Sequence, residues 1–471
     1  MRRPLTPDLC VIGAGAGGLA VAAGAAQMGA SVVLVERDRM GGDCLNFGCV
    51  PSKSLLWTGR IAALWRRGGE LGIAYAPPRV DFPAVADSIA RVVARLAPND
   101  SAERFTGLGV TVLKAEARFV DRRTVLAGAV EIRPRRCVVA TGSEPVIPPI
   151  PGLAALPHFT NETIFANRVL PRHLIVIGGG PIGVELAQAH RRLGAEVTIL
   201  DIGPILPRED PELAALLAAR LAAEGVALRP RVTIDAVARD GEALAVTLAG
   251  GERISGSHLL VAAGRRPAIA ALDLAAAGIA ATAEGITVDR RLRTTNRRVF
   301  AIGDVAGGPQ FTHRALHHAG VVIKNALFHI PARTRERGLP RVVYTDPELA
   351  RVGLDERAAH AAGAVRVLRW SFAESDRAHT ERDTEGLVKI VTTKRGHILG
   401  AAILGAEAGE LILPWALAIA RHLPLRALAD LIVPYPTRGE ASKRAAASFY
   451  TPALFSARTR RLVRLLARLG S

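Results

Sequence analysis

A repeated pattern of strand, glycine-rich turn and helix constrains this chain more than any other feature. Residues 9–18 read LCVIGAGAGG and residues 174–183 read LIVIGGGPIG, so each copy is an apolar stretch that runs into the pattern GxGxxG. Each copy continues through a helix-like stretch to a second apolar strand, residues 31–36 and 196–201, which ends on an acid. The acid follows the first glycine at the same spacing in both copies, from 13 to 36 and from 178 to 201. Two such motifs at one spacing predict two dinucleotide-binding folds.

The glycines and the acid have the same expected roles in both copies. The first glycine allows a tight turn, the second lets the backbone approach a pyrophosphate, and the third lets the helix pack closely on the strand. The pyrophosphate lies at the positive end of the helix, and the acid accepts hydrogen bonds from the adenosine ribose. The predicted nucleotide-binding residues are therefore Gly13, Gly15, Gly18 and Glu36 in the first copy, and Gly178, Gly180, Gly183 and Asp201 in the second.

The N-terminal stretch from Leu9 to Val35 carries no formal charge and so resembles a signal peptide or a membrane span. Its glycines instead fit a strand–turn–helix–strand unit, and strands buried on both faces of a parallel sheet are expected to lack charges. We therefore interpret the stretch as part of the fold and expect a cytoplasmic protein. The 471 residues are enough for about three domains.

The chain is strongly basic, with a formal net charge of +18. The basic residues are scattered and no nucleic-acid-binding motif accompanies them, so we expect no nucleic-acid partner. Only residues 458–468, RTRRLVRLLAR, form a dense basic stretch. We interpret it as an ordinary helix end that packs on its own domain. The alternative is an amphipathic helix that lies at a membrane surface.

The four cysteines fall into two kinds. Cys10 and Cys137 lie in apolar, strand-like stretches and are expected to be buried, inert thiols. Cys44 and Cys49 lie in residues 41–53, GGDCLNFGCVPSK. Two cysteines at this spacing can approach to disulfide distance where the chain enters a helix, and a helix N-terminus lowers the pKa of a thiol. Two unrelated thiols are the alternative.

The segment 41–53, placed after a glycine motif, resembles the active-site sequence of the class I pyridine nucleotide-disulfide oxidoreductases. This family includes dihydrolipoamide dehydrogenase, glutathione reductase and mercuric reductase. Four further segments carry the resemblance along the chain: residues 137–143 (CVVATGS, the end of a strand of the FAD domain), 262–267 (AAGRRP, for ATGRxP), 300–304 (FAIGD, the second FAD motif) and 344–348 (YTDPE, the start of the dimerisation domain).

The resemblance implies an α/β fold with two Rossmann-like domains, for FAD and NAD(P), and an α+β dimerisation domain. We expect the first part of the FAD domain in residues 1–150 and the NAD(P) domain in residues 151–280. A central segment, residues 281–338, would complete the FAD domain, and residues 339–471 would form the dimerisation or interface domain. A homodimer is expected, because in this family the C-terminal motif serves the active site of the partner subunit.

The resemblance also implies roles for individual residues. Cys49 would be the thiol beside the flavin, which forms a charge-transfer thiolate, and Cys44 would be the interchange thiol that meets the substrate. Lys53 would pair with Glu185 beside the flavin N5, and Asp304 would reach the flavin ribitol. The remaining residues implied in cofactor binding are Gly42, Thr141, Gly142, Ser143, Gly264 and Gly303.

Asp201 bears on the choice of nicotinamide cofactor. A carboxylate at the end of this strand accepts a hydrogen bond from a free 2′-hydroxyl and repels a 2′-phosphate. We therefore expect a preference for NADH over NADPH, while the loop from Ile202 to Arg208 offers an alternative source of positive charge.

The C-terminal motif departs from the family pattern. Where disulfide-reducing members have His-Pro-Thr-x-x-Glu, residues 435–440 read YPTRGE, so Tyr435 replaces the acid–base histidine and Glu440 remains. A phenol, with an ordinary pKa near about 10, is a poor proton shuttle at neutral pH. Tyrosine at this place resembles mercuric reductase, and reduction of mercury(II) needs thiolate ligands rather than a proton for a leaving thiol. Mercuric reductases also carry a C-terminal cysteine pair, whereas no cysteine follows Cys137 here.

We predict that NAD(P)H reduces FAD, that FAD reduces a disulfide between Cys44 and Cys49, and that Cys44 passes the electrons to an acceptor, with mercury(II) as the first candidate. The alternatives are a dihydrolipoamide dehydrogenase-like enzyme or other disulfide reductase, a reductase of a quinone-type acceptor at a membrane, and a non-enzymatic flavin redox sensor. We expect no resident metal, so Cys44 and Cys49 would bind a soft metal only as substrate. His313, His317 and His318 are interpreted as packed or solvated, with contact to flavin or substrate as the alternative.

Overall fold

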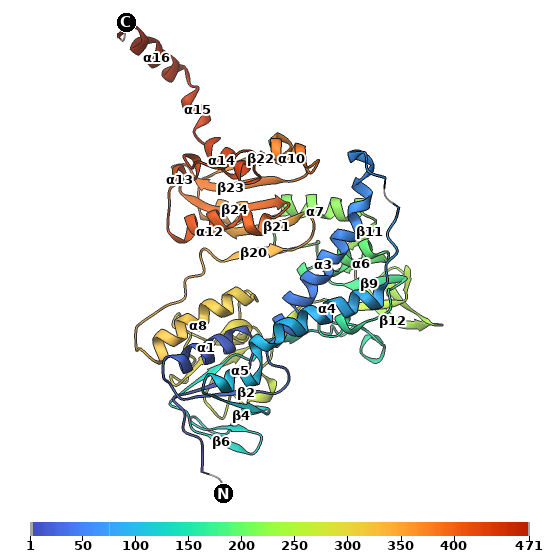
Figure 1. Cartoon of the computed structure of the whole chain (residues 1–471), viewed down its shortest axis with the longest axis vertical. Coiled ribbons are helices and arrows are strands. Elements are labelled where there is room, and N and C mark those ends of the chain that lie inside the picture. The colour runs from blue at the N-terminus through green and yellow to red at the C-terminus, as the bar shows by residue number, and fades with distance from the viewer. Residues whose placement is uncertain (1–2, 75, 470–471) are drawn as a thin grey trace. The chain divides into compact units, whose positions relative to one another are not determined.

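The computed structural model of the chain describes residues 3–74 and 76–469 (Figure 1). Its contacts divide it into two compact units. The first unit contains the chain up to Ile202 together with Val226–Thr334, and the second contains Gly203–Gly225 and the chain from Arg335. Both nucleotide-binding sheets belong to the first unit, so the division does not test the expected boundaries at residues 150 and 280, which remain predictions.

The first sheet is five-stranded and parallel, with the strand order β19-β7-β1-β2-β3. Two of its strands and its first helix come from the first glycine repeat, in agreement with the sequence pattern. Helices α1 and α8 pack together beside it. The elements are β1 (Leu9–Ile12), α1 (Ala16–Gln27), β2 (Val32–Glu36), β3 (Val110–Lys114), β7 (Arg136–Val139), β19 (Val299–Ala301) and α8 (Thr312–Ala326). Strand β19 therefore joins a sheet whose other strands all lie far earlier in the chain.

The second parallel sheet has four strands in the order β11-β10-β9-β15 and comes from the second repeat. It consists of β9 (His173–Ile177), β10 (Glu196–Asp201), β11 (Val226–Pro230) and β15 (His258–Val261), with helix α6 (Pro181–Leu193) after the glycine loop. A three-stranded antiparallel sheet accompanies it, formed by β12 (Ile234–Asp240), β13 (Ala243–Leu248) and β14 (Arg253–Gly256). The expectation of an α/β fold with two Rossmann-like halves is confirmed.

The uncharged N-terminal stretch is explained by burial in the first sheet. Leu9, Cys10 and Val11 are fully buried in β1, and Cys10 lies beside Cys137 of β7 in the strand register. Both cysteines are buried free thiols, as predicted from their apolar surroundings. Among the helices of the described residues, none is long and apolar enough to cross a bilayer.

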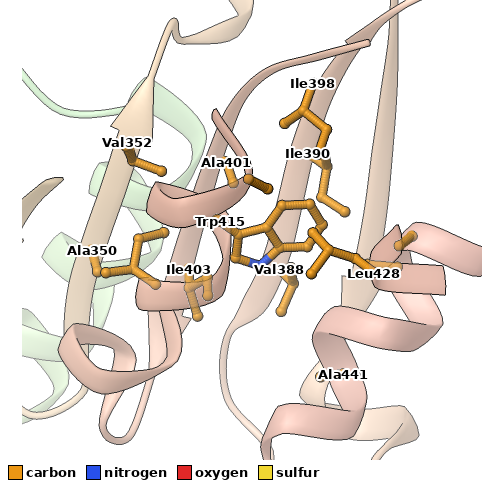
Figure 2. Close-up of a cluster of buried hydrophobic side chains, with 14 of the residues drawn as sticks. Ala350, Val352, Val388, Ile390, Ile398, Ala401, Ile403, Trp415, Leu428 and Ala441 are labelled. Carbon is orange, nitrogen blue, oxygen red and sulfur yellow. The ribbon is translucent and has the colours of Figure 1, made fainter. Parts of the chain in front are cut away.

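The second unit is built on an antiparallel sheet with the strand order β20-β21-β24-β23-β22, which confirms the expected α+β domain. The strands are β20 (Pro340–Val343), β21 (Glu348–Gly353), β22 (Val365–Ser371), β23 (Leu387–Thr393) and β24 (Ile398–Gly405). Trp415 of helix α12 (Leu413–Ala420) is fully buried and lies among aliphatic side chains of β23 and β24 (Figure 2). Its Nε1 donates a hydrogen bond to Ser442 Oγ at 3.0 Å, which ties α12 to α14 (Gly439–Ala447).

The basic C-terminal stretch forms helix α16 (Ala457–Leu469), which follows the short helix α15 (Thr451–Leu454). Leu462, Val463, Leu465 and Leu466 are 53%, 59%, 56% and 55% exposed. In Figure 1 the two helices run outward from the sheet of their own unit. The expectation that this stretch packs on its own domain is therefore wrong: its apolar side chains have no surface of that domain to cover them.

Candidate active site

The two glycine loops have the same local geometry. Gly13 and Gly178, the first glycines, have φ angles of +103° and +116°, which side chains rarely tolerate. A Cβ atom on Gly18 would lie 1.9 Å from the carbonyl oxygen of Gly13, and one on Gly183 would lie 1.9 Å from that of Gly178. Only glycine at these third positions allows the helix to start so close to the strand.

The second glycines face open space. A Cβ atom on Gly180 would meet nothing within 4 Å, and one on Gly15 would meet only the Cα of Gly42, at 3.9 Å. Each of these glycines is the residue immediately before a helix, α1 or α6, so free backbone N–H groups are available at the helix N-terminus. The residues present therefore fit a dinucleotide pyrophosphate in both loops.

The acid at the end of each second strand lies beside its glycine loop. Glu36 Oε2 accepts a hydrogen bond from the backbone N–H of Ala14 at 2.6 Å. Asp201 Oδ2 accepts one from the N–H of Gly179, also at 2.6 Å. Both carboxylates thus stand where the strand meets the loop, the place from which an acid reaches an adenosine ribose in this fold.

The cysteine segment forms two consecutive helices. Cys44 lies in the short helix α2 (Gly42–Asn46) and is half-buried, while Cys49 is the first residue of helix α3 (Cys49–Ala63) and is exposed. Both are free thiols in this structure and share a hydrogen bond. Thr312, the first residue of α8, places its Oγ1 3.5 Å from Cys49 Sγ. The structure thus brings the two predicted redox cysteines together.

This arrangement separates the pKa values of the two thiols. The hydrogen bond from Cys44 lowers the pKa of Cys49 to about 6. Partial desolvation of the sulfur by the surrounding protein opposes the shift, while the Thr312 hydroxyl and the charge of Lys53 add to it. The same hydrogen bond, together with burial, raises the pKa of Cys44. Cys49 also starts a 15-residue helix, whose N-terminus favours a negative charge. The arrangement therefore favours Cys49 as the thiolate of the pair and Cys44 as the protonated thiol.

Lys53 and Glu185 lie on two different helices and meet. Lys53 belongs to α3, the helix of the redox segment, and Glu185 belongs to α6, the helix of the second glycine repeat. Lys53 Nζ lies 2.9 Å from Glu185 Oε2. The Glu185 side chain is only 7% exposed, whereas that of Lys53 is 37% exposed. A buried carboxylate therefore fixes an ammonium group in the same helix as Cys49.

A hydrogen-bond network beside Cys44 was not foreseen from the sequence. Arg265 donates from Nη2 to Asp43 Oδ1 at 3.1 Å, from Nη1 to Asn161 Oδ1 at 2.8 Å and from Nε to Ser143 Oγ at 2.9 Å. Ser143 Oγ in turn donates to Asp304 Oδ2 at 2.7 Å. The sequence offered a signal for two of these residues, because Asp43 is a charged residue next to a redox cysteine and Arg265 is a charged residue inside a family motif. Asn161 gave no such signal.

The other residues predicted to bind cofactors lie around the same loops. Thr141 Oγ1 donates to the carbonyl of Ala268 at 2.8 Å, and Gly142, Gly264 and Gly303 all have positive φ angles. Burial raises the pKa of Asp304, which the hydroxyl of Ser143 partly offsets. The N–H of Gly303 donates to Nδ1 of the buried His318 at 3.2 Å, so this histidine is packed, as expected.

A cavity of about 410 Å³ gives access to Cys44. Its apolar walls come from α1 and from side chains of other segments: Leu45, Val50, Leu96, Phe105 and Leu316. Cys44 lines it too, and the segment after helix α4 (Phe82–Leu96) adds the polar residues Asn99, Asp100 and Arg104. Burial raises the pKa of Asp100. Cys49 does not line this cavity, so a molecule inside it meets Cys44 first.

Tyr435 and Glu440 belong to the second unit, and the thiols belong to the first. Tyr435 is 66% exposed, and its hydroxyl donates a hydrogen bond to Asp376 Oδ2. This hydrogen bond and the negative charge of Asp376 raise the pKa of the phenol. Glu440 Oε1 accepts a hydrogen bond from Arg444 Nη2 at 2.8 Å. Over the described part of the chain, no group of three or more His, Cys, Asp or Glu side chains is placed to hold a metal ion.

Comparison with known proteins places this geometry in a family. The family model "Pyridine nucleotide-disulphide oxidoreductase" matches residues 7–319, and the model of its dimerisation domain matches residues 339–446. A mercuric reductase from Streptomyces lividans is 37% identical over 94% of this chain and 96% of its own length. A dihydrolipoyl dehydrogenase from Bacillus subtilis is 35% identical over the same shares.

The solved structure of an HOCl-induced flavoprotein disulfide reductase from Escherichia coli, in its Cu(II) complex, superposes with a TM-score of 0.85 at 29% identity and covers 93% of this chain and 99% of the other. The glycine loops with their acids and the paired cysteines are features of the family that both models match. The chain therefore belongs to the pyridine nucleotide-disulphide oxidoreductases, a family of FAD-dependent enzymes that use NAD(P)H.

Proposed function

We propose that this protein uses NAD(P)H to reduce a thiol-binding metal ion, mercury(II), through Cys49 and Cys44. The observation that carries the proposal is the state of Tyr435. The residue at the acid–base position of the family is a phenol whose hydroxyl is engaged by Asp376 and whose pKa is raised by that contact. Chemistry that needs a proton donor for a leaving thiol is poorly served by such a group.

The residues of the first unit support the electron path. The chemistry that bound FAD would supply is the transfer of two electrons from NAD(P)H to the cysteine pair. The first glycine loop, Glu36 and the linked pair Ser143–Asp304 would hold FAD. Lys53, fixed by Glu185, supplies a positive charge next to the Cys49 thiolate.

The two cysteine thiols alone supply the two electrons that reduce mercury(II). Mercury(II) reaches the cavity as a complex with small thiols, and the sulfur atoms of Cys44 and Cys49 displace them as soft ligands. On this exchange the cysteine protons pass to the departing small thiolates. The two mercury-bound cysteine sulfurs then join as a disulfide and give up two electrons, while mercury(II) gains those two electrons and leaves as the element. No step requires Tyr435 to deliver a proton to a leaving thiol.

Three similar proteins support a metal ion as acceptor. Mercuric reductases from Streptomyces lividans and Acidithiobacillus ferrooxidans are 37% and 36% identical to this chain. The Escherichia coli flavoprotein of similar fold is solved as a Cu(II) complex. We infer that the metal passes from small thiols to Cys44, because Cys44 is the cysteine of the pair that lines the cavity.

We further propose that NADH is preferred and that the working unit is a homodimer. The Asp201 carboxylate, held at the second glycine loop, disfavours the 2′-phosphate of NADPH. The match to the dimerisation model supports the homodimer, in which Tyr435 and Glu440 would serve the thiols of the partner subunit.

A dithiol or disulfide substrate is the second candidate, supported by the 35% identity to a dihydrolipoyl dehydrogenase. The two functions are separated by measuring NADH oxidation with mercury(II) in excess thiol and, separately, with lipoamide. We expect mercury-dependent NADH oxidation with release of volatile mercury, and loss of at least about 100-fold of this activity in Cys44→Ser. Tyr435→Phe, the matched variant without a phenol hydroxyl, should keep NADH oxidation within about tenfold of the parent enzyme. Fast lipoamide turnover without mercury turnover would overturn the proposal.

A further inference from the structure

Helix α16 (Ala457–Leu469) is not used by the electron path described above. It lies after residue 446, where the match to the dimerisation model ends. Its thirteen residues contain no acid and five arginines: Arg458, Arg460, Arg461, Arg464 and Arg468.

The apolar and basic side chains of α16 occupy different faces. Leu462, Leu465 and Leu466 are spaced three and four residues apart and so share one face of the helix. Arg460 and Arg464, four residues apart, lie on the opposite face. All five of these side chains are exposed. The helix therefore presents a strip of leucines flanked by positive charge.

The apolar surface continues at the N-terminal side of α16. Leu454 at the end of α15 and Phe455 after it are 59% and 70% exposed. Exposed apolar groups gathered in this way mark a surface that binds something. The occupant must cover leucine side chains and at the same time carry negative charge.

A bilayer with anionic phospholipids meets both requirements. Its headgroups pair with the arginines and its acyl region covers the leucines, which is how a short amphipathic helix lies in a membrane surface. The α16 of a second copy is disfavoured as the occupant, because it would bring five more arginines and no acid to pair with them. Nucleic acid would satisfy the arginines but leave the leucine strip uncovered.

We propose that α16 binds the surface of anionic bilayers and holds the flavoprotein there. The helix lies in the plane of the interface rather than across it, because its thirteen residues are too few to span the hydrocarbon core. This binding does not depend on which acceptor the thiols reduce, so it is tested independently of mercury(II) reduction.

The test is sedimentation of the full-length, FAD-loaded protein with two kinds of vesicle. One kind is phosphatidylcholine alone, and the other is equal parts phosphatidylcholine and phosphatidylglycerol. We expect binding to the anionic vesicles that weakens as salt is raised. Arg460→Gln with Arg464→Gln should weaken it about 30-fold, since each basic residue near an anionic surface contributes about a fivefold factor. Leu462→Ser with Leu466→Ser should weaken it by about tenfold or more per leucine.

The matched control is Arg395→Gln with Arg421→Gln, which removes the same charge from exposed positions elsewhere in the second unit. This variant should bind within about twofold of the parent protein. NADH oxidation with a soluble acceptor should be unchanged in all three variants, which shows that they fold. Equal binding to neutral vesicles, an equal loss in the control, or a change of oligomeric state in the leucine variant would each overturn the proposal. Tighter binding to duplex DNA than to anionic vesicles would overturn it as well.

Discussion

Comparing Cys44→Ala with Cys44→Ser tests the hydrogen bond that separates the two thiol pKa values. Both variants leave Cys49 as the single thiol of the pair. Serine keeps a hydroxyl donor at the position of the Cys44 thiol, whereas alanine removes it. Because the hydrogen bond from Cys44 is the largest cause of the low Cys49 pKa, the two variants should differ in the charge of Cys49.

The size of the difference follows from the two limits of the Cys49 pKa. With a pKa of about 6, Cys49 is a thiolate in about 90% of molecules at pH 7. A free cysteine, with a pKa of about 8.5, would be a thiolate in about 3%. Thr312, Lys53 and the N-terminus of α3 remain in the alanine variant, so its thiolate fraction should fall between these limits.

The assay is a pH titration of each FAD-loaded variant, followed by the long-wavelength absorbance that a thiolate gives beside oxidised flavin. We expect this absorbance to appear at clearly lower pH in Cys44→Ser than in Cys44→Ala. Identical titration curves would refute the role of the hydrogen bond and leave the helix N-terminus and Lys53 as the causes.

Four further variants test other parts of the structure. Lys53→Met should lower the free energy of unfolding by about 1–2 kcal/mol in a urea titration. This loss is smaller than that of a fully buried pair, because Lys53 is partly exposed. Adding Glu185→Gln should recover part of the lost free energy, and no recovery would argue against the pairing. Asp201→Ser should raise kcat/KM for NADPH relative to NADH by about tenfold, and an unchanged ratio would remove Asp201 from cofactor choice. Tyr435→His should raise lipoamide turnover by about 100-fold relative to mercury turnover, and no rise would show that the phenol is not what limits thiol chemistry. Trp415→Ala should cost about 3–5 kcal/mol of unfolding free energy in guanidinium, and a loss below about 1 kcal/mol would contradict its place in the core.

The two nucleotide-binding sheets were predictable because their signals are local and periodic. The first repeat predicted strands at 9–12 and 31–36, and the structure has β1 at Leu9–Ile12 and β2 at Val32–Glu36. Glycines at fixed offsets mark turns whose backbone admits no side chain, as the clash expected at Gly18 shows. Such constraints depend on a few neighbouring residues and can therefore be recognised from the sequence.

The structural features that the sequence did not predict depend on contacts between residues far apart in the chain, or on the absence of a contact. The network of Arg265 with Asp43 and Asn161 joins three segments far apart in sequence, which no local pattern encodes. The contact of Tyr435 with Asp376 is of the same kind. The amphipathic pattern of α16 predicted a helix correctly, but the pattern is the same whether the apolar face meets protein or solvent.

The most direct test of the central claim is an anaerobic titration of the purified enzyme with NADH, followed by absorbance and by a count of reactive thiols. The account predicts that the first two electrons produce a long-wavelength thiolate–flavin band together with two new thiols, and that Cys44→Ser gains no thiols on NADH addition. Simple bleaching of the flavin, with no such band and no new thiols in the parent enzyme, would show that Cys44 and Cys49 are not a redox pair.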